Sequence, residues 1–219
     1  MNMDTVIDRI AMRVEKLLKC PVIPIEASGR HVHLSAEAIV RLFGEGAGLT
    51  RVSELSQPGQ YVCKERLRVT GPKGELPSVV VLGPLRDETQ VEISATDAIT
   101  LGINAPVRLS GNITGTPGVK LTGPAGELEL PCGVIIAQRH IHMTPEDANR
   151  WNLEDGQTVS VRVFTERPVT FNGVILRVSP SFATYMHIDY DEANACGFTK
   201  AMAGIIVDDS ITEVNSFGY

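Results

Sequence analysis

A six-residue segment occurs twice in the chain, and this repeat sets the strongest limit on the fold. Residues 30–35 read RHVHLS, and 109 residues later residues 139–144 read RHIHMT. In each copy two histidines alternate with apolar residues, which predicts a short strand with both imidazoles on one face. The closing hydroxyl residue can cap the helix expected next, over Ala36–Phe43 in one half and Pro145–Trp151 in the other. We therefore expect two similar halves.

A second pair of similar segments follows the first, at an offset of 95 residues. Glu92–Ala98 and His187–Ala193 each place a capping residue three positions before an acidic residue, which is the spacing of a capping box. The helix expected in each half then ends at a glycine, Gly102 or Gly197, as a left-handed terminating residue requires. Strand, cap, short helix and glycine thus follow in the same order twice, which favours two pseudo-symmetric small β-barrels with short capping helices.

The rest of the chain is typical of a mainly β protein. It has 20 glycines, 13 prolines and only 5% aromatic residues, and short apolar runs alternate with turn signals. Asn172-Gly173 divides the last of these runs and predicts a hairpin turn. No glycine-rich phosphate loop follows a strand, which argues against Rossmann and P-loop folds. The expected strands are Tyr61–Val69, Ser78–Leu82, Val107–Leu109, Val134–Ala137, Val159–Val163 and Val169–Val178.

The N-terminal segment has a different pattern. Apolar residues from Ile7 to Leu18 recur at helical spacing with charged residues between them, and Pro21 ends the pattern. This predicts an amphipathic helix within residues 1–20. Its apolar face either docks onto another protein surface or packs on its own domain.

Charge and cysteine content exclude several functional classes. Lys and Arg number 20 against 26 Asp and Glu, a net charge of −6, so we expect no nucleic-acid partner, because neutralising phosphates needs a basic surface. No apolar run is long enough for a membrane span, and no secretory signal is evident. Cys20, Cys63, Cys132 and Cys196 are scattered without a CxxC pair, which suits a cytoplasmic protein.

All five histidines of the chain lie in the repeated segments, and the position equivalent to a sixth is Glu92. Two imidazoles two residues apart on a strand can converge on one metal ion, and a third ligand from another strand completes the set. Three protein ligands with one open position is the arrangement of catalytic zinc, although cobalt or nickel would fit the same ligands. Spacing alone leaves open an exchange of Glu92 and His187 between the two sets. The favoured grouping is His31, His33 and Glu92 for one metal, and His140, His142 and His187 for the other.

Arg86 breaks the symmetry of the halves, since the matching position is Ser181. It lies six residues before Glu92, after a Gly-Pro turn, where a guanidinium could bind an anion such as phosphate in bidentate fashion. Arg30 and Arg139 precede the ligands and should point to the opposite strand face, so we expect ion pairs for them. With every histidine assigned to a metal and no nucleophilic serine motif, the chemistry must come from the metals. A hydrolase would need only water, whereas a transferase would need a competing nucleophile such as phosphate.

Over roughly residues 20–208, the chain resembles the PduL-type phosphotransacylases, which are phosphate propanoyltransferases. The resemblance implies two interleaved β-barrels with two zinc ions between them. It also implies the interconversion of propanoyl- or acetyl-CoA plus phosphate with the acyl phosphate plus CoA, which we expect to occur by direct attack of phosphate. The favoured ligand sets match the two zinc sites of this family, and Arg86 matches its phosphate-binding arginine. The segments that carry the resemblance are Arg30–Ser35, Gly83–Glu92, Val107–Gly118, Gln138–Glu146 and Met186–Ala195.

The resemblance further implies a domain division and a set of partners. We expect an encapsulation segment at residues 1–20, a first barrel at 30–137, and a second barrel built from 21–29 with 138–219. In many members of this family an N-terminal helix directs the enzyme into a bacterial microcompartment, so we expect residues 1–20 to bind shell or core proteins there. A homodimer is also expected. The alternatives are a two-metal hydrolase of thioesters or phosphoesters, and a non-catalytic, metal-stabilised microcompartment scaffold.

Overall fold

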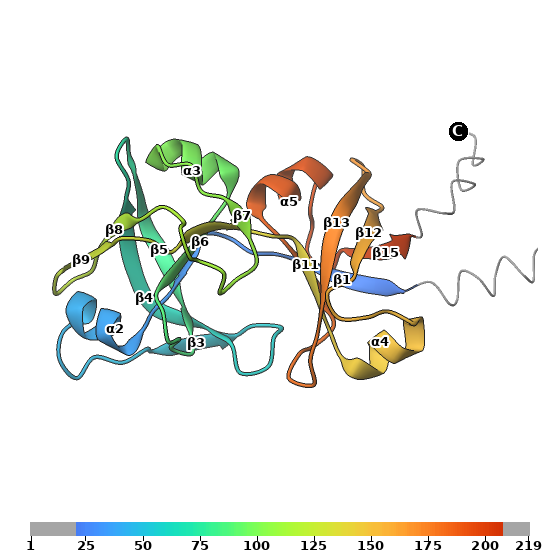
Figure 1. Ribbon diagram of the computed structural model, residues 1–219, viewed down its shortest axis with the longest axis horizontal. Helices are drawn as coiled ribbons and strands as arrows, with labels where there is room; N and C mark the ends of the chain where they lie inside the picture. The colour runs from blue at the N-terminus through green and yellow to red at the C-terminus, as the bar shows by residue number, and fades with distance from the viewer. Residues whose placement is uncertain (1–20, 208–219) are drawn as a thin grey trace, which may run out of the picture. The chain divides into compact units, whose positions relative to one another are not determined.

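The computed structural model describes residues 21–207 and confirms the prediction of a mainly β protein with short helices (Figure 1). The helices in this part of the chain are α2 (Ala36–Phe43), α3 (Ala95–Leu101), α4 (Pro145–Trp151) and α5 (Tyr190–Cys196). The strands are β1 (Val22–Ala27), β2 (His31–His33), β3 (Arg51–Glu54), β4 (Tyr61–Thr70), β5 (Glu75–Gly83), β6 (Gln90–Ile93), β7 (Val107–Arg108), β8 (Val119–Thr122), β9 (Glu127–Leu130), β10 (Val134–Ala137), β11 (His140–Met143), β12 (Thr158–Val163), β13 (Val169–Val178), β14 (Tyr185–Ile188) and β15 (Ala203–Val207).

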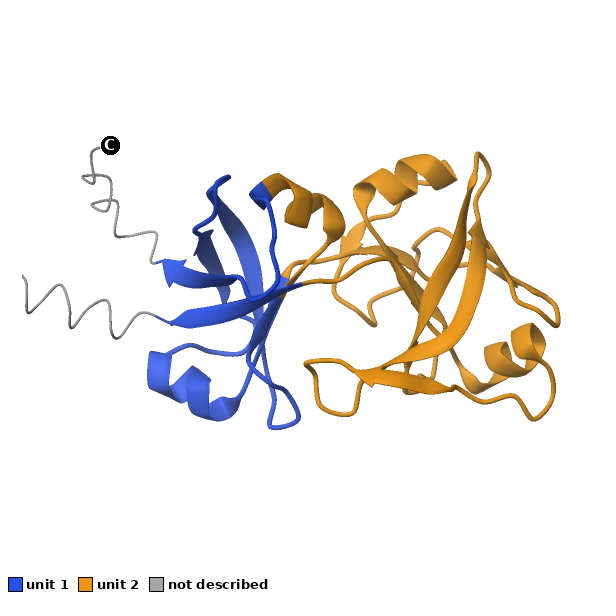
Figure 2. Ribbon diagram, turned by 180° about the vertical axis from the view of Figure 1, so that it is seen from behind, with its two compact units in different colours: residues 1–26, 140–186, 196–219 blue, residues 27–139, 187–195 orange. Residues whose placement is uncertain are grey.

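The described residues form two compact units (Figure 2). Unit 1 takes residues 21–26, 140–186 and 196–207, and unit 2 takes residues 27–139 and 187–195. Each unit therefore draws on separated stretches of the chain. The domain boundaries expected from the family resemblance stay a prediction.

A closed barrel forms most of unit 1, with its strands in the order β1, β14, β11, β13, β12, β15. Strand β12 pairs antiparallel with β13 and β15, whereas β11 runs parallel to β13. Ile141, Val161 and Leu176 on these strands are fully buried and supply the apolar interior that holds the barrel together. The strand β14 continues past the division between the units, so its residue His187 belongs to the barrel sheet although it is grouped with unit 2.

Asn172-Gly173 lies inside the ten-residue strand β13, so the predicted hairpin is wrong. Gly173 has a φ of 70°, and the register of β12 against β13 shifts between Val159 and Val161. The side-chain oxygen of Asn172 accepts a hydrogen bond from the Ser160 hydroxyl at 3.0 Å. The dipeptide thus forms a β-bulge. Because a left-handed glycine serves a bulge as well as a turn, the local sequence does not separate the two.

Unit 2 is built on a nine-stranded sheet that curls into a half-barrel. Its strands follow the order β7, β10, β6, β2, β5, β4, β8, β9, and β3 pairs with β4. The strand β2 therefore lies inside the sheet, parallel to β5 and antiparallel to β6. Val32, Leu67, Val81 and Leu121 belong to the buried core that this sheet covers. The two barrels expected from the repeat are thus one closed barrel and one curled sheet.

The two His-x-His segments end in the same local structure. Ser35 and Thr144 cap α2 and α4 as predicted, because each side chain accepts a hydrogen bond from the backbone N–H three residues on. The backbone N–H groups of the same two residues donate to the hydroxyls of Thr89 and Thr184, at 3.1 and 3.2 Å. Each histidine strand is therefore fixed at the point where it passes into its helix.

The second pair of repeated segments also agrees with the sequence. Capping boxes begin α3 and α5, with Asp97 and Glu192 as the acidic residues, and both helices end at the predicted glycines, which have positive φ. Arg30 pairs with Asp97 at 3.0 Å, and Arg139 pairs with Glu192 at 2.6 Å. The ion pairs expected for the two arginines are confirmed, and each links a His-x-His strand to the capped helix of the same repeat.

The predicted N-terminal amphipathic helix falls within residues 1–20 and lies outside the described residues, as do residues 208–219. Among residues 21–207, no helix combines the length and the apolar character needed to cross a membrane.

Candidate metal centres

Three side chains from neighbouring strands of unit 2 form the first triad, which consists of His31, His33 and Glu92. His31 and His33 alternate with buried Val32 on β2, and His31 lies directly opposite Glu92 on β6. One potential ligand atom from each lies within 4.8 Å of the others, and all three side chains are buried. His31 Nε2 is 3.6 Å from Glu92 Oε2, and His33 Nε2 is 3.9 Å from Glu92 Oε1. These separations leave room for one ion between the donors.

A backbone contact fixes the tautomer of His31. Its Nδ1 lies 2.8 Å from the carbonyl oxygen of Gly29, which can only accept, so Nδ1–H is the donor. In the neutral ring the lone pair is then on Nε2, the atom that faces Glu92. A hydrogen bond from the far ring nitrogen to a carbonyl is the usual orientation of a metal-binding histidine.

The electrostatics of the first triad favour an ionised Glu92 and a neutral His33. Burial and the neighbouring His31 hold the pKa of His33 well below its ordinary value. Although burial alone would raise it, the pKa of Glu92 is held well below its usual range, chiefly by the charge and hydrogen bond of His31. Burial opposes a charge on His31 as well, but the Glu92 carboxylate raises its pKa above the ordinary value. A proton on His31 and a divalent cation therefore compete for the same anionic carboxylate.

The chemistry of the donor atoms is the test of whether a metal fits this triad. His31 Nε2 and His33 Nε2 each approach a different oxygen of Glu92, and all three side chains are buried away from water that would compete for an ion. Two imidazoles with one carboxylate also match the donors that zinc accepts. The residues present therefore fit a metal ion.

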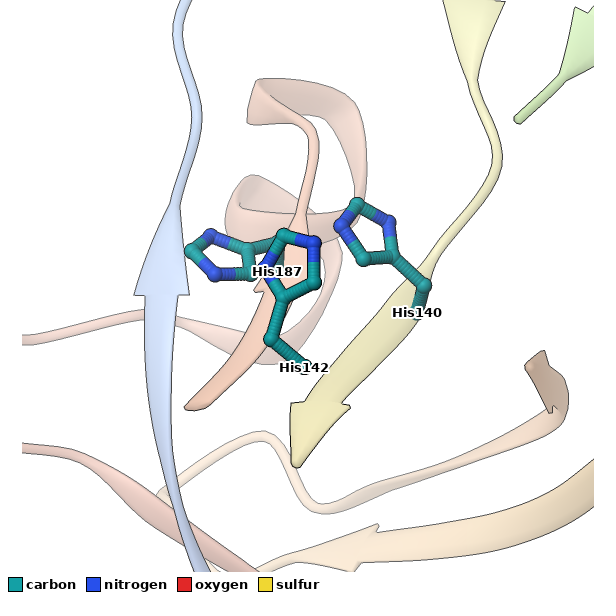
Figure 3. A group of neighbouring side chains, drawn as sticks. All are labelled: His140, His142 and His187. Carbon is teal, nitrogen blue, oxygen red and sulfur yellow. The ribbon is translucent and has the colours of Figure 1, made fainter. Parts of the chain in front are cut away.

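The second triad consists of His140 and His142 on β11 and His187 on β14, which are neighbouring strands of the closed barrel. Figure 3 shows the three imidazole rings gathered beside one another. One potential ligand atom from each lies within 4.8 Å of the others, with His140 and His142 buried and His187 half-buried. Because this triad has no carboxylate, a divalent cation bound here would keep more positive charge than one bound by the first triad.

Three further side chains lie around the second triad. The ring of Phe182 lies 4.2 Å from that of His142, between centroids, and the Arg177 guanidinium lies 5.7 Å from the centre of the Phe182 ring. Gln57 Nε2 is 3.4 Å from His187 Nε2. These contacts restrict the orientation of two of the three imidazoles.

Arg86 lies next to the first triad. Its backbone N–H donates to the Leu34 carbonyl at 2.9 Å, which ties its loop to the end of β2. Its Nη1 donates to the hydroxyl of Ser110 at 2.8 Å, and that hydroxyl donates to Glu92 Oε1 at 2.8 Å. Arg86 and His33 also line a cavity of about 280 Å³, together with residues 58–60 and Gly83-Pro84. A guanidinium is thus held beside a candidate metal site and an open cavity, which suits an anionic substrate.

Comparison with known proteins identifies the family of the chain. Residues 24–199 match the family model for phosphate propanoyltransferase. The chain is 53% identical over 205 residues to the phosphate propanoyltransferase of Clostridioides difficile, covering 94% of this chain and 97% of the relative. It is 53% identical over 206 residues to that of Enterococcus faecalis (94% and 97%) and 55% identical over 185 residues to that of Listeria monocytogenes (84% and 87%). The chain belongs to the phosphate propanoyltransferase family. The predicted resemblance is confirmed, and phosphate propanoyltransferases are acyltransferases.

The structure of this phosphate propanoyltransferase family member also places residues near the triads that the sequence analysis did not single out. Gln90 could have been found, because strand alternation puts it on the same face of β6 as Glu92. Ser110 follows β7 and Gln57 precedes β4, each in a loop, and no local pattern connects either one to a histidine. Phe182 could not be predicted either, since nothing in the sequence around a single aromatic residue in a loop indicates that it packs on His142.

Proposed function

We propose that this chain interconverts propanoyl-CoA plus phosphate with propanoyl phosphate plus CoA, using a metal ion at each triad. Membership of the phosphate propanoyltransferase family supports the reaction. The observation that carries the proposal is the pair of hydrogen bonds from Arg86 to Ser110 and from Ser110 to Glu92. Through them an anion-binding guanidinium is joined to a metal-ligand carboxylate.

Zinc is the metal we propose for both triads, because imidazole-rich sets with an open position suit it. His31, His33 and Glu92 would hold one ion, and His140, His142 and His187 would hold the other. Bound zinc would polarise the thioester carbonyl and stabilise the CoA thiolate as it leaves.

Arg86 is the catalytic residue that we assign to phosphate. Its fork of N–H donors can bind two phosphate oxygens and turn a third toward the thioester carbon. In the forward reaction the phosphate oxygen forms a bond to that carbon and the carbon–sulfur bond breaks. The electron pair of this bond leaves on sulfur, and the proton of hydrogen phosphate ends on the CoA thiol.

No covalent acyl-enzyme is needed for this reaction. Every histidine is assigned to a metal, so none is left to act as a base for a side-chain nucleophile. Burial, with a contribution from Glu65, raises the pKa of the Cys63 thiol to about 11, so Cys63 is a poor nucleophile at neutral pH. Direct attack by phosphate is therefore the simplest route.

The test is CoA release by the purified full chain from propanoyl-CoA and from acetyl-CoA, with and without phosphate, combined with elemental analysis for metal. The proposal expects release that depends on phosphate, two zinc equivalents per chain, and loss of activity on chelation. Release without phosphate would instead identify a two-metal hydrolase. A protein that holds metal and releases no CoA under either condition would identify a scaffold.

For localisation and assembly, we propose a homodimer in a bacterial microcompartment of the propanediol-utilisation type, with residues 1–20 docking on a shell or core protein. The helical spacing of apolar residues in that segment supports this role. Deleting residues 1–20 should leave CoA release intact and abolish co-sedimentation with purified microcompartments. Unchanged co-sedimentation would contradict the docking role, and light scattering of the full chain tests the dimer.

A further inference from the structure

Ser110 lies between the Arg86 guanidinium and the Glu92 carboxylate of unit 2 and bonds to both. Its Oγ atom is 2.8 Å from Arg86 Nη1, 2.8 Å from Glu92 Oε1 and 2.9 Å from Gln90 Nε2. We propose that Ser110 is a positioning residue that keeps Arg86 ready for phosphate while it orients Glu92 toward the metal. This inference rests on the proposed function, because it takes phosphate and a metal ion as the ligands of those two residues.

The hydrogen-bonding capacity of the hydroxyl determines the direction of each bond. Arg86 and the amide nitrogen of Gln90 can only donate, so the Ser110 oxygen accepts from both. A hydroxyl has two lone pairs and one hydrogen, and the hydrogen is then left for Glu92 Oε1. The hydroxyl is fully used, and rotating it to serve another partner would break one of the three bonds.

Gln90 supports the same arrangement from the strand. Its Nε2 donates to Glu92 Oε1 at 2.6 Å as well as to Ser110, and its Oε1 accepts from the backbone N–H of Gly111 at 2.7 Å. Since Gly111 N–H can only donate, the amide of Gln90 has one possible orientation. The loop that carries Ser110 is thereby fastened to β6, two residues before the metal ligand.

The two oxygens of Glu92 have different roles as a result. Oε1 accepts hydrogen bonds from Ser110 and Gln90, whereas Oε2 is the oxygen 3.6 Å from His31 Nε2. A carboxylate anchored through one oxygen presents the other in a fixed direction, which is how outer contacts orient a metal ligand. The anchor here also carries Arg86, so a single hydroxyl positions both the metal ligand and the phosphate donor.

The test compares Ser110→Ala with Ser110→Thr in the full-length, zinc-loaded protein, using inorganic phosphate as the probe in calorimetric titrations. Loss of one charge-assisted hydrogen bond predicts about tenfold weaker phosphate binding for Ser110→Ala. Ser110→Thr keeps the hydroxyl and should recover most of that affinity. Zinc content should change little, because three ligands and the Gln90 anchor remain. Ser53→Ala, an exposed serine on β3, is the matched control.

A double-mutant cycle separates positioning from a general structural effect. In an Arg86→Ala background, Ser110→Ala should weaken phosphate binding no further, because the group that it positions is gone. Equal phosphate affinity of wild type and Ser110→Ala, or additive losses in the cycle, would overturn the inference. Wild-type protein that binds no phosphate would overturn it together with the role of Arg86. Phosphate binding that responds to Ser110 in a protein that releases no CoA would overturn the proposed function alone.

Discussion

His31 and Glu92 face each other across the antiparallel strands β2 and β6, and His31 Nε2 lies 3.6 Å from Glu92 Oε2. The pair combines one negative charge with a lone pair whose direction is set by Gly29. Its neighbour His33 adds a second imidazole from the same strand face. We expect this group of three side chains to hold the metal ion of unit 2. Removing the charge of the Glu92 carboxylate tests that expectation.

Glu92→Gln should reduce the metal content from two equivalents per chain to one. The amide keeps the shape of the side chain but is a much weaker ligand for a divalent cation, so the first triad loses its only anionic donor. CoA release should fall by about 100-fold or more. Elemental analysis and a thiol assay measure the two effects, with exposed Glu88→Gln as the control from the preceding loop. Two retained equivalents in Glu92→Gln would refute the assignment of this ligand.

Arg86→Ala should raise the KM for phosphate by about tenfold or more and lower kcat severely, because the guanidinium both binds and orients the nucleophile. Arg86→Lys should recover only part of the loss, since a single ammonium cannot bind two oxygens in one plane. Initial rates over a range of phosphate concentrations give both constants. Exposed Arg108→Ala removes a similar charge elsewhere in unit 2 and should behave as wild type. Near-normal phosphate kinetics in Arg86→Ala would show that another group binds phosphate.

His140→Ala should remove one metal equivalent and leave the other in place. His140 belongs to the second triad on β11, whereas the first triad takes its ligands from β2 and β6. The loss should therefore be independent of the loss in Glu92→Gln, and the double variant should hold no tightly bound metal. Activity should fall strongly in each single variant, because we propose that both ions serve the same reaction. An active His140→Ala variant with one metal would leave the second triad without a part in catalysis.

Cys63 should resist alkylation in the native protein. Its side chain is fully buried, and its pKa of about 11 leaves only about one thiol in a thousand ionised at pH 8. The half-buried Cys132 is the internal comparison. Iodoacetamide treatment followed by peptide mass mapping should modify Cys132 well before Cys63, and urea should remove the difference. Equal modification of the two in the native state would show that the Cys63 region opens readily.

Much of the local structure could be predicted from the sequence because the repeated segments contain the residues that begin and end their helices. Cap, acidic residue and terminating glycine occur at fixed spacing around α3 and α5. The helices α2 and α4 also begin and end where the sequence placed them. The histidines could be grouped for a similar reason, because residues two apart on a strand lie on the same face, which is a short-range property.

Long-range features were out of reach for the same reason. Whether a sheet closes into a barrel depends on whether its edge strands pair with each other. Of the two sheets in residues 21–207, one closes into a barrel. The bulge at Asn172-Gly173 was mistaken for a turn because only the partner strand distinguishes them. Ser110 was missed because its contacts with Arg86 and Glu92 span 24 and 18 residues of chain.

The repeat also differs from itself at one instructive position, where Glu92 in one copy corresponds to His187 in the other. The two triads, each with a His-x-His strand and an arginine–carboxylate pair beside it, thereby differ by one unit of charge. The Glu92 carboxylate would lower the Lewis acidity of a cation bound by the first triad, whereas the neutral His187 would leave that of a cation in the second triad higher. One side chain therefore sets how much positive charge a bound divalent cation would retain, and the triad with three imidazoles would attract an anionic ligand more strongly than the triad with the carboxylate.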